Sequence, residues 1–196
     1  MTSAAVIRLH AFVAATEEPI LEAAAQRLSG LLAEGRDGGA SVEAVFAASL
    51  GELDPGAPGV VAIGSLLPEV PAARADWAAA EARLMRRYRN LAARGAERLF
   101  LCTVFRHVPP ELEEQERISL RVAIRRLDLL AVNISHATGL NVIDLDRALA
   151  DIGAMPLETD YRLGGAAAVA AAGGVVASAL LAAGIEDLPA SADPVR

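Results

Sequence analysis

Four polar residues near the ends of apolar segments have the side-chain types that acyl transfer requires. They are Thr16, Ser65, His107 and Asp160. A hydroxyl is a weak nucleophile until an imidazole takes its proton, and a carboxylate commonly orients that imidazole. We therefore treat these four residues as candidate catalytic residues of a hydroxyl–imidazole–carboxylate site.

The hydroxyls and the histidine also have ordinary structural interpretations. Serines at the ends of strands, here Ser49 and Ser65, most often form turns. Thr16 is a candidate N-cap of the helix that follows it. His107 follows an apolar segment, where loop capping or exposure to solvent is commoner than acid–base chemistry. The residue types alone therefore leave catalysis and structure as alternatives.

Asp160 stands just before a long uncharged run, residues 163–185. If its carboxylate is partly buried, it needs hydrogen-bond donors, because an unpaired buried charge is costly. We expect these donors to be the Thr16 hydroxyl, the first backbone amides of the N-terminal helix, or Arg162. In that interpretation Asp160 is structural.

Metal ligands are sparse in this sequence. The three histidines, His10, His107 and His136, do not have the i, i+4 spacing of a helical metal pair, and Cys102 is the only cysteine. A zinc site and an intramolecular disulfide are therefore not expected. The glycine-rich segment 36–40 does not match a phosphate-binding loop. We expect no metal and no cofactor.

Five short apolar segments are typical of strands that are covered on both faces. They are residues 6–14, 42–48, 59–63, 99–105 and 141–145, and helical patterns occupy 17–35, 77–95, 111–139, 147–152 and 163–185. Strands that alternate with helices predict an α/β domain with a parallel sheet. The connection 48–59 is short for a parallel crossover, so we expect it to be tight and mostly non-helical.

Length and composition favour one domain. The 196 residues are 54 % hydrophobic but 4 % aromatic, so the core must consist mainly of Ala, Leu, Val and Ile. We expect the domain to span 1–187 and a flexible tail to occupy 188–196. The net charge of −7 makes non-specific nucleic-acid binding unfavourable.

Two properties of the sequence bear on the cellular location of the protein. The N-terminus has no basic segment followed by a long apolar core, so we expect no signal peptide and a cytoplasmic location. Residues 163–185 are long enough to span a bilayer, at about 20 residues, but consist mostly of Ala and Gly. We therefore expect a buried helix packed on the sheet and not a membrane span.

Arginines are concentrated in two predicted helices of this acidic chain. One group contains Arg83, Arg86 and Arg87, and the other lies within 117–126. A solvated helix face balanced by nearby glutamates is the ordinary interpretation. The functional alternative is a docking surface, through Arg83, Arg86 and Arg87, for an acidic protein or a phosphate-bearing carrier. The sequence leaves a homo-oligomer open.

The order of segments over residues 6–185 resembles that of the SGNH (GDSL-type) hydrolase family. The likeness is greatest in RRLDLLAVNISHATGLNVIDLDRALADIG, residues 125–153, which is similar to the family's late helix, a strand reading "vidl" and a short helix. The resemblance implies a flavodoxin-like three-layer sandwich of the SGNH type, with a five-stranded parallel sheet and helices on both faces.

The resemblance also implies an active site, from which this chain departs. The family's Gly-Asp-Ser position reads Ala14-Ala15-Thr16, and its Gly-x-Asn-Asp block reads Gly64-Ser65-Leu66-Leu67. Gly51 matches the family's glycine block, so Gly51 and Gly64 are candidate ligand-binding residues. The terminal Asp-x-x-His block reads Asp160-Tyr161-Arg162-Leu163, so a leucine stands where the resemblance implies the base.

The preferred interpretation is a non-catalytic domain, or pseudoenzyme, that binds a ligand or partner in a bacterial biosynthetic or assembly pathway. The alternative is an atypical esterase or acyl-transfer enzyme with a rebuilt site. A weaker third interpretation is a flavodoxin-like flavin or nucleotide binder, which residues 14–19 disfavour because they contain no Ser/Thr-rich phosphate loop.

Overall fold

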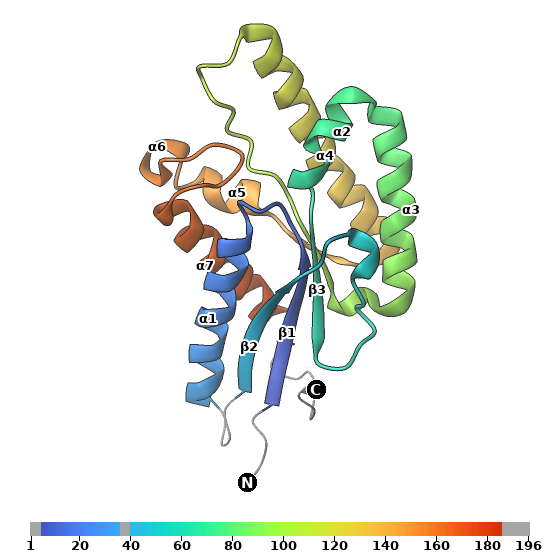
Figure 1. Ribbon diagram of the computed structural model, residues 1–196, viewed down its shortest axis with the longest axis vertical. Coiled ribbons are helices and arrows are strands. Elements are labelled where there is room, and N and C mark those ends of the chain that lie inside the picture. Colours follow the sequence, from blue (N-terminus) through green and yellow to red (C-terminus); the bar gives the residue numbers. More distant parts are fainter. Residues whose placement is uncertain (1–4, 36–39, 186–196) are drawn as a thin grey trace.

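Five parallel strands form the sheet of this protein, in a computed structural model that describes residues 5–35 and 40–185 (Figure 1). They are β1 (Ala5–Phe12), β2 (Ala40–Phe46), β3 (Val60–Ser65), β4 (Leu99–Cys102) and β5 (Asn141–Ile143). Their order in the sheet is β2-β1-β3-β4-β5. The five expected strands are confirmed, although β1, β2, β4 and β5 each end two or three residues before the apolar segments do.

Helices cover both faces of the sheet (Figure 1). One layer contains α1 (Glu18–Gly35), α5 (Leu145–Ala150), α6 (Ala154–Leu157) and α7 (Ala166–Ala182), and the other contains α2 (Val70–Ala75), α3 (Trp77–Gly95) and α4 (Glu114–Thr138). The expected three-layer α/β sandwich is therefore confirmed.

Side chains of β3 alternate between the two cores. Val61 and Ile63 pack on the α1 and α7 side, whereas Ala62 packs on the α3 and α4 side. Every residue of this strand is buried. That pattern explains why its sequence is a continuous apolar run, since a central parallel strand is covered on both faces.

The long uncharged segment near the C-terminus contains α7, which is packed against α1. A Cβ atom at Gly173 would lie 3.0 Å from the Cβ of Ala23 and 3.1 Å from the carbonyl oxygen of Ile20, so the two helices approach very closely there. In the part of the chain that the structure describes, no helix combines the length and the apolar character needed to cross a membrane. The packed-helix prediction is confirmed.

Some local features differ from the predictions. Residues 70–75 and 154–157 form the short helices α2 and α6, which were not predicted. The connection before β3 is tight, as expected, and holds only one short 3-10 helix, Leu50–Glu52. The expected tail at 188–196 lies outside the described residues.

Candidate functional site

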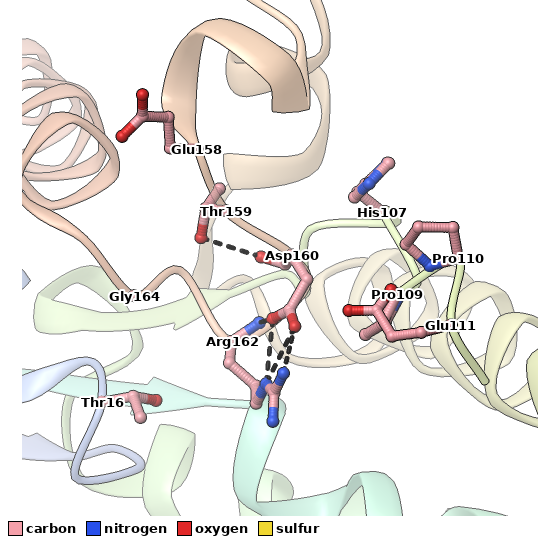
Figure 2. Close-up of a pocket in the computed structure, with 10 residues that line it drawn as sticks. All are labelled: Thr16, His107, Pro109, Pro110, Glu111, Glu158, Thr159, Asp160, Arg162 and Gly164. Atoms are coloured by element: carbon pink, nitrogen blue, oxygen red, sulfur yellow. Dashed lines mark hydrogen bonds and ion pairs between the residues drawn. The ribbon is translucent and has the colours of Figure 1, made fainter.

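Three of the four candidate catalytic residues line one cavity at the carboxyl edge of the sheet. Thr16, His107 and Asp160 surround a space of about 490 Å³, together with Arg162 and Gly164 (Figure 2). Ligands commonly bind at this edge of an open parallel sheet. Thr16 reaches the cavity from the loop after β1, His107 from the segment after β4, and Asp160 from the segment before α7.

The carboxylate of Asp160 is occupied by Arg162. The Arg162 backbone N–H donates to Oδ1 over 2.9 Å, and Nε lies 3.0 Å from both carboxylate oxygens. The guanidinium Nη2 also donates to Oδ2 (Figure 2). Burial by itself would raise the pKa of Asp160, but these hydrogen bonds and the Arg162 charge outweigh it, so the pKa is lowered. Of the three donor sets expected for Asp160, Arg162 is the one observed.

The position that follows this pair holds a buried leucine. Leu163 is 1 % exposed and has a φ of 56°, an unusual conformation for a residue with a side chain. Its backbone N–H donates to the carbonyl oxygen of Asp160 over 3.0 Å. The segment 160–163 is therefore a tight turn, with an apolar side chain where the family resemblance implies an imidazole.

His107 supports this turn through its backbone. Its carbonyl oxygen accepts the N–H of Tyr161 over 2.7 Å, and its exposed ring is stacked on Phe105 with the ring centroids 6.3 Å apart. Within residues 5–35 and 40–185, no side-chain hydrogen bond connects His107 with Thr16 or Asp160. The cavity therefore gathers the residue types of a triad without linking them.

The fourth candidate, Ser65, lies apart from this cavity in a buried pair with Glu17. Its Oγ donates to Glu17 Oε1 over 2.7 Å and accepts the N–H of Leu67 over 3.0 Å. Ser65 is 1 % exposed and Glu17 is 3 % exposed. Burial raises the pKa of Glu17 to about 7, although hydrogen bonds from Ala14 N–H and Ser65 oppose that rise.

Sequence reasoning missed Glu17 as a site residue, because an acid at a helix start is ordinary. Its Oε2 accepts the backbone N–H of Ala14 over 2.9 Å, so Glu17, and not Thr16, bonds back across the turn that precedes α1. The available signal was an acid three residues after Ala14, the spacing at which a carboxylate bonds back to the start of a helix.

The two candidate glycines have different surroundings. A Cβ at Gly64 would lie 2.2 Å from the hydroxyl oxygen of Tyr88, a fully buried side chain. Gly51 is exposed and lines a separate cavity of about 460 Å³ with Ser49 and Arg87. Gly51 and Gly64 therefore do not border the cavity of Asp160.

The candidate docking arginines all lie on α3 but differ in their partners. Arg83 Nη2 is 2.5 Å from Glu69 Oε2, a carboxylate that is largely buried. Arg86 and Arg87 are exposed, and no carboxylate lies within 4.0 Å of either among the described residues. Arg83 is thus a structural ion-pair partner, whereas the other two guanidiniums face solvent.

The part of the chain with a described structure contains no group of three or more His, Cys, Asp or Glu side chains arranged to hold a metal ion. Cys102 is buried, and that burial raises the pKa of its thiol well above the usual range. It is therefore not placed as a metal ligand or nucleophile.

Comparisons with known proteins bear on the fold. No family model and no curated protein matches this sequence. Solved structures do: phospholipase A1 from Streptomyces albidoflavus NA297 has a TM-score of 0.53 at 12 % identity, covering 92 % of this chain and 99 % of that one. An extracellular lipase from Streptomyces rimosus gives 0.55 at 14 %, covering 92 % and 100 %.

A putative SGNH hydrolase from Slackia heliotrinireducens has a TM-score of 0.55 at 13 % identity, covering 91 % of this chain and all of the other. At such low identity the likeness concerns the fold and not the residues of a site. The strand order, the two helical layers and these neighbours agree with the family resemblance of the sequence. This chain has the fold of the SGNH hydrolases.

Proposed function

We propose that this protein is a non-catalytic SGNH-type domain that binds a ligand or partner. The observation that carries the proposal is the Asp160–Arg162 pair, followed by the buried Leu163. A carboxylate that is held by a guanidinium is not available to orient an imidazole, and the leucine provides no imidazole.

The remaining residues of the cavity support the same conclusion. Thr16 has a hydroxyl, but without a positioned base a hydroxyl is a weak nucleophile. Among the described residues that line the cavity, His107 alone has an imidazole, and its ring is stacked on Phe105. Replacing an oriented base with an undirected one removes most of the rate that such a site can supply.

The binding role is proposed for the exposed face of α3. Arg83, Arg86 and Arg87 would dock an acidic protein or a phosphate-bearing carrier in a bacterial biosynthetic or assembly pathway in the cytoplasm. Arg86 and Arg87 supply the exposed charge, while Arg83 is paired with Glu69. Exposed cationic groups mainly accelerate encounter with an acidic partner and make it salt-dependent.

Hydrolysis of short-chain aryl esters tests the catalytic half of this proposal. The purified protein should show no turnover above background, and Thr16→Ala and Asp160→Ala should match the parent. Turnover that is well above background and is lost in either variant would refute the non-catalytic assignment.

Loss of salt-dependent partner association in Arg86→Ala/Arg87→Ala, at unchanged melting temperature, would support the docking role, and unchanged association would contradict it.

An atypical esterase or acyltransferase is the second candidate, and the Ser65–Glu17 pair favours it. A carboxylate 2.7 Å from a hydroxyl, with a pKa of about 7, has the reach and basicity of a general base. Both side chains are buried, however, so a substrate would need the first turn of α1 to open.

A matched pair of variants tests this alternative. Ser49 also donates to a glutamate, Glu52, over 3.1 Å, but on the surface. If the alternative holds, ester turnover should disappear in Ser65→Ala and persist in Ser49→Ala. Equal turnover in the two variants would exclude Ser65 as the nucleophile.

A further inference from the structure

A second cavity, of about 520 Å³, lies beside the Asp160 cavity and is lined by basic side chains. It is bordered by residues of the segment after β4, the first half of α4 and the α5–α6 region. Its charged lining residues are Arg106, Arg117, Arg121 and Arg125, with His107 beside them. No acidic residue lines it within the described residues 5–35 and 40–185, although the chain carries a net charge of −7.

Two of these guanidiniums already have carboxylate partners. Arg106 donates to Asp146 over 2.9 Å, and Arg117 is paired with Glu114. Arg117 nevertheless retains an unused donor, because its Nε is buried without a hydrogen-bond partner in the described structure. A buried donor without an acceptor is unfavourable, so a side-chain movement that brought this Nε to the cavity would let a ligand oxygen remove that cost.

The other two guanidiniums have no carboxylate partner in the described part of the chain. Arg121 and Arg125 are exposed, and among the described residues no carboxylate oxygen lies within 4.0 Å of them. Arg125 also borders a neighbouring cavity that contains Asp128, Asp144 and Asp146, but it forms no ion pair with these residues. The basic cavity therefore has charge that no described carboxylate pairs with.

The spacing of three arginines along α4 puts their side chains on one face of the helix. Arg117, Arg121 and Arg125 are four residues apart, and residues i and i+4 lie on the same helix face. Guanidinium groups offer planar, forked sets of donors that match the oxygens of a phosphate. Phe105, Val108 and Ala154 are the larger apolar part of the same lining.

We propose that this cavity is a binding site for a small organic phosphate, with the phosphate at Arg117, Arg121 and Arg125 and an apolar group against Phe105 and Val108. The volume falls within the range of small-molecule sites, about 300–1,000 Å³. The proposal goes beyond the function proposed above, because it holds whether or not the Asp160 cavity is catalytic.

Calorimetric titration with phenyl phosphate at low ionic strength tests this site. Phenyl phosphate should bind at least tenfold more tightly than inorganic phosphate and than benzoate. Arg121→Ala/Arg125→Ala should weaken it at least tenfold. Arg27→Ala/Arg89→Ala, which removes the same charge from exposed positions of α1 and α3, should change it less than twofold.

Absence of phenyl phosphate binding at millimolar concentration would overturn the proposal. So would equal weakening in the two double variants, which would indicate attraction by overall charge. Equal affinity for benzoate would exclude a phosphate site. Because Arg121 and Arg125 are exposed, both double variants should melt with the parent. Ester hydrolysis by the parent would contradict the non-catalytic function and leave this binding result unaffected.

Discussion

Adding one methyl group at Gly64 should destabilise the protein through a single contact with Tyr88. The new Cβ would lie 2.2 Å from the tyrosine hydroxyl oxygen, 3.1 Å from Cζ and 3.2 Å from Cε1. Ordinary van der Waals contact begins at 3.4 Å, so the first distance is more than 1 Å too short. Tyr88 is fully buried, and a close-packed core resists movement of its ring.

The expected cost follows from this geometry. Overpacking a core side chain costs about 1–3 kcal/mol, and the 2.2 Å contact places Gly64→Ala near the upper end. The Tyr88 hydroxyl is itself buried without a hydrogen-bond partner in the described structure. Leaving such a group unpaired costs about 1–3 kcal/mol, so Tyr88→Phe should be neutral or stabilising.

A double-mutant cycle measured by urea unfolding separates these effects. In Gly64→Ala/Tyr88→Phe the closest contact disappears, but the 3.1 Å contact to the ring carbon remains. The rescue should therefore be partial, with a coupling free energy of about 1–2 kcal/mol between the two sites.

Equal destabilisation by Gly64→Ala with and without the tyrosine hydroxyl would refute this reasoning. That result would mean that the strand moves as a whole and that the Tyr88 contact does not limit residue 64. A large loss of stability in Tyr88→Phe would also contradict it, since the hydroxyl would then have a partner.

Three further outcomes are expected. Between pH 4.5 and 7 the folded protein retains a proton on Glu17 that the unfolded chain has released. As the pH rises over that window, the free energy of unfolding of the parent should therefore fall by about 3 kcal/mol more than that of Glu17→Gln. Parallel pH profiles of the urea midpoint would contradict this. Asp160→Asn should cost about 1 kcal/mol at pH 7, since solvent reaches the Arg162 side of this pair. The pKa of Asp160 is lower in the folded than in the unfolded protein, so the cost should begin to shrink below the unfolded pKa of 3.8 and disappear only below the folded pKa; a pH-independent cost would argue against it. Gly173→Ala should lower the melting temperature because the new Cβ would contact the α1 backbone. Gly174→Ala should leave it unchanged, because only the flexible Arg27 guanidinium lies near that position. Equal melting temperatures for the two variants would show that α7 can shift away from α1.

The fold could be predicted because its strands carry strong local patterns. β3 is apolar at nearly every position, as burial on both faces requires, and the helical stripe of α3 keeps Leu84, Tyr88 and Leu91 in the core. The helices α2 and α6 were missed because they span only 6 and 4 residues and contain proline, so periodicity has no length in which to appear.

The site was only partly predictable. The order of segments along the chain predicted that Thr16, His107 and Asp160 lie near one another, and all three line one cavity. The prediction was possible because the loops that follow parallel strands meet at the carboxyl edge of the sheet. The Glu17–Ser65 pair could not be foreseen, since it joins residues 48 positions apart through side chains whose direction depends on the turn before α1. Local sequence reports the secondary structure of both residues but not their contact.

The two edges of the sheet differ in their tendency to recruit another chain. β5 is three residues long, too short for a stable added ladder, whereas β2, at the other edge, is seven residues long, Ala40–Phe46. The ion pair of Arg8 with Glu43, at 2.7 Å, puts charge on the surface beside that longer edge, but Val45 is 38 % exposed there. Edge strands of this kind are where aggregation starts. In concentrated solution β2 is therefore the strand to protect, and a lysine in place of Val45 is the first substitution to make for solubility.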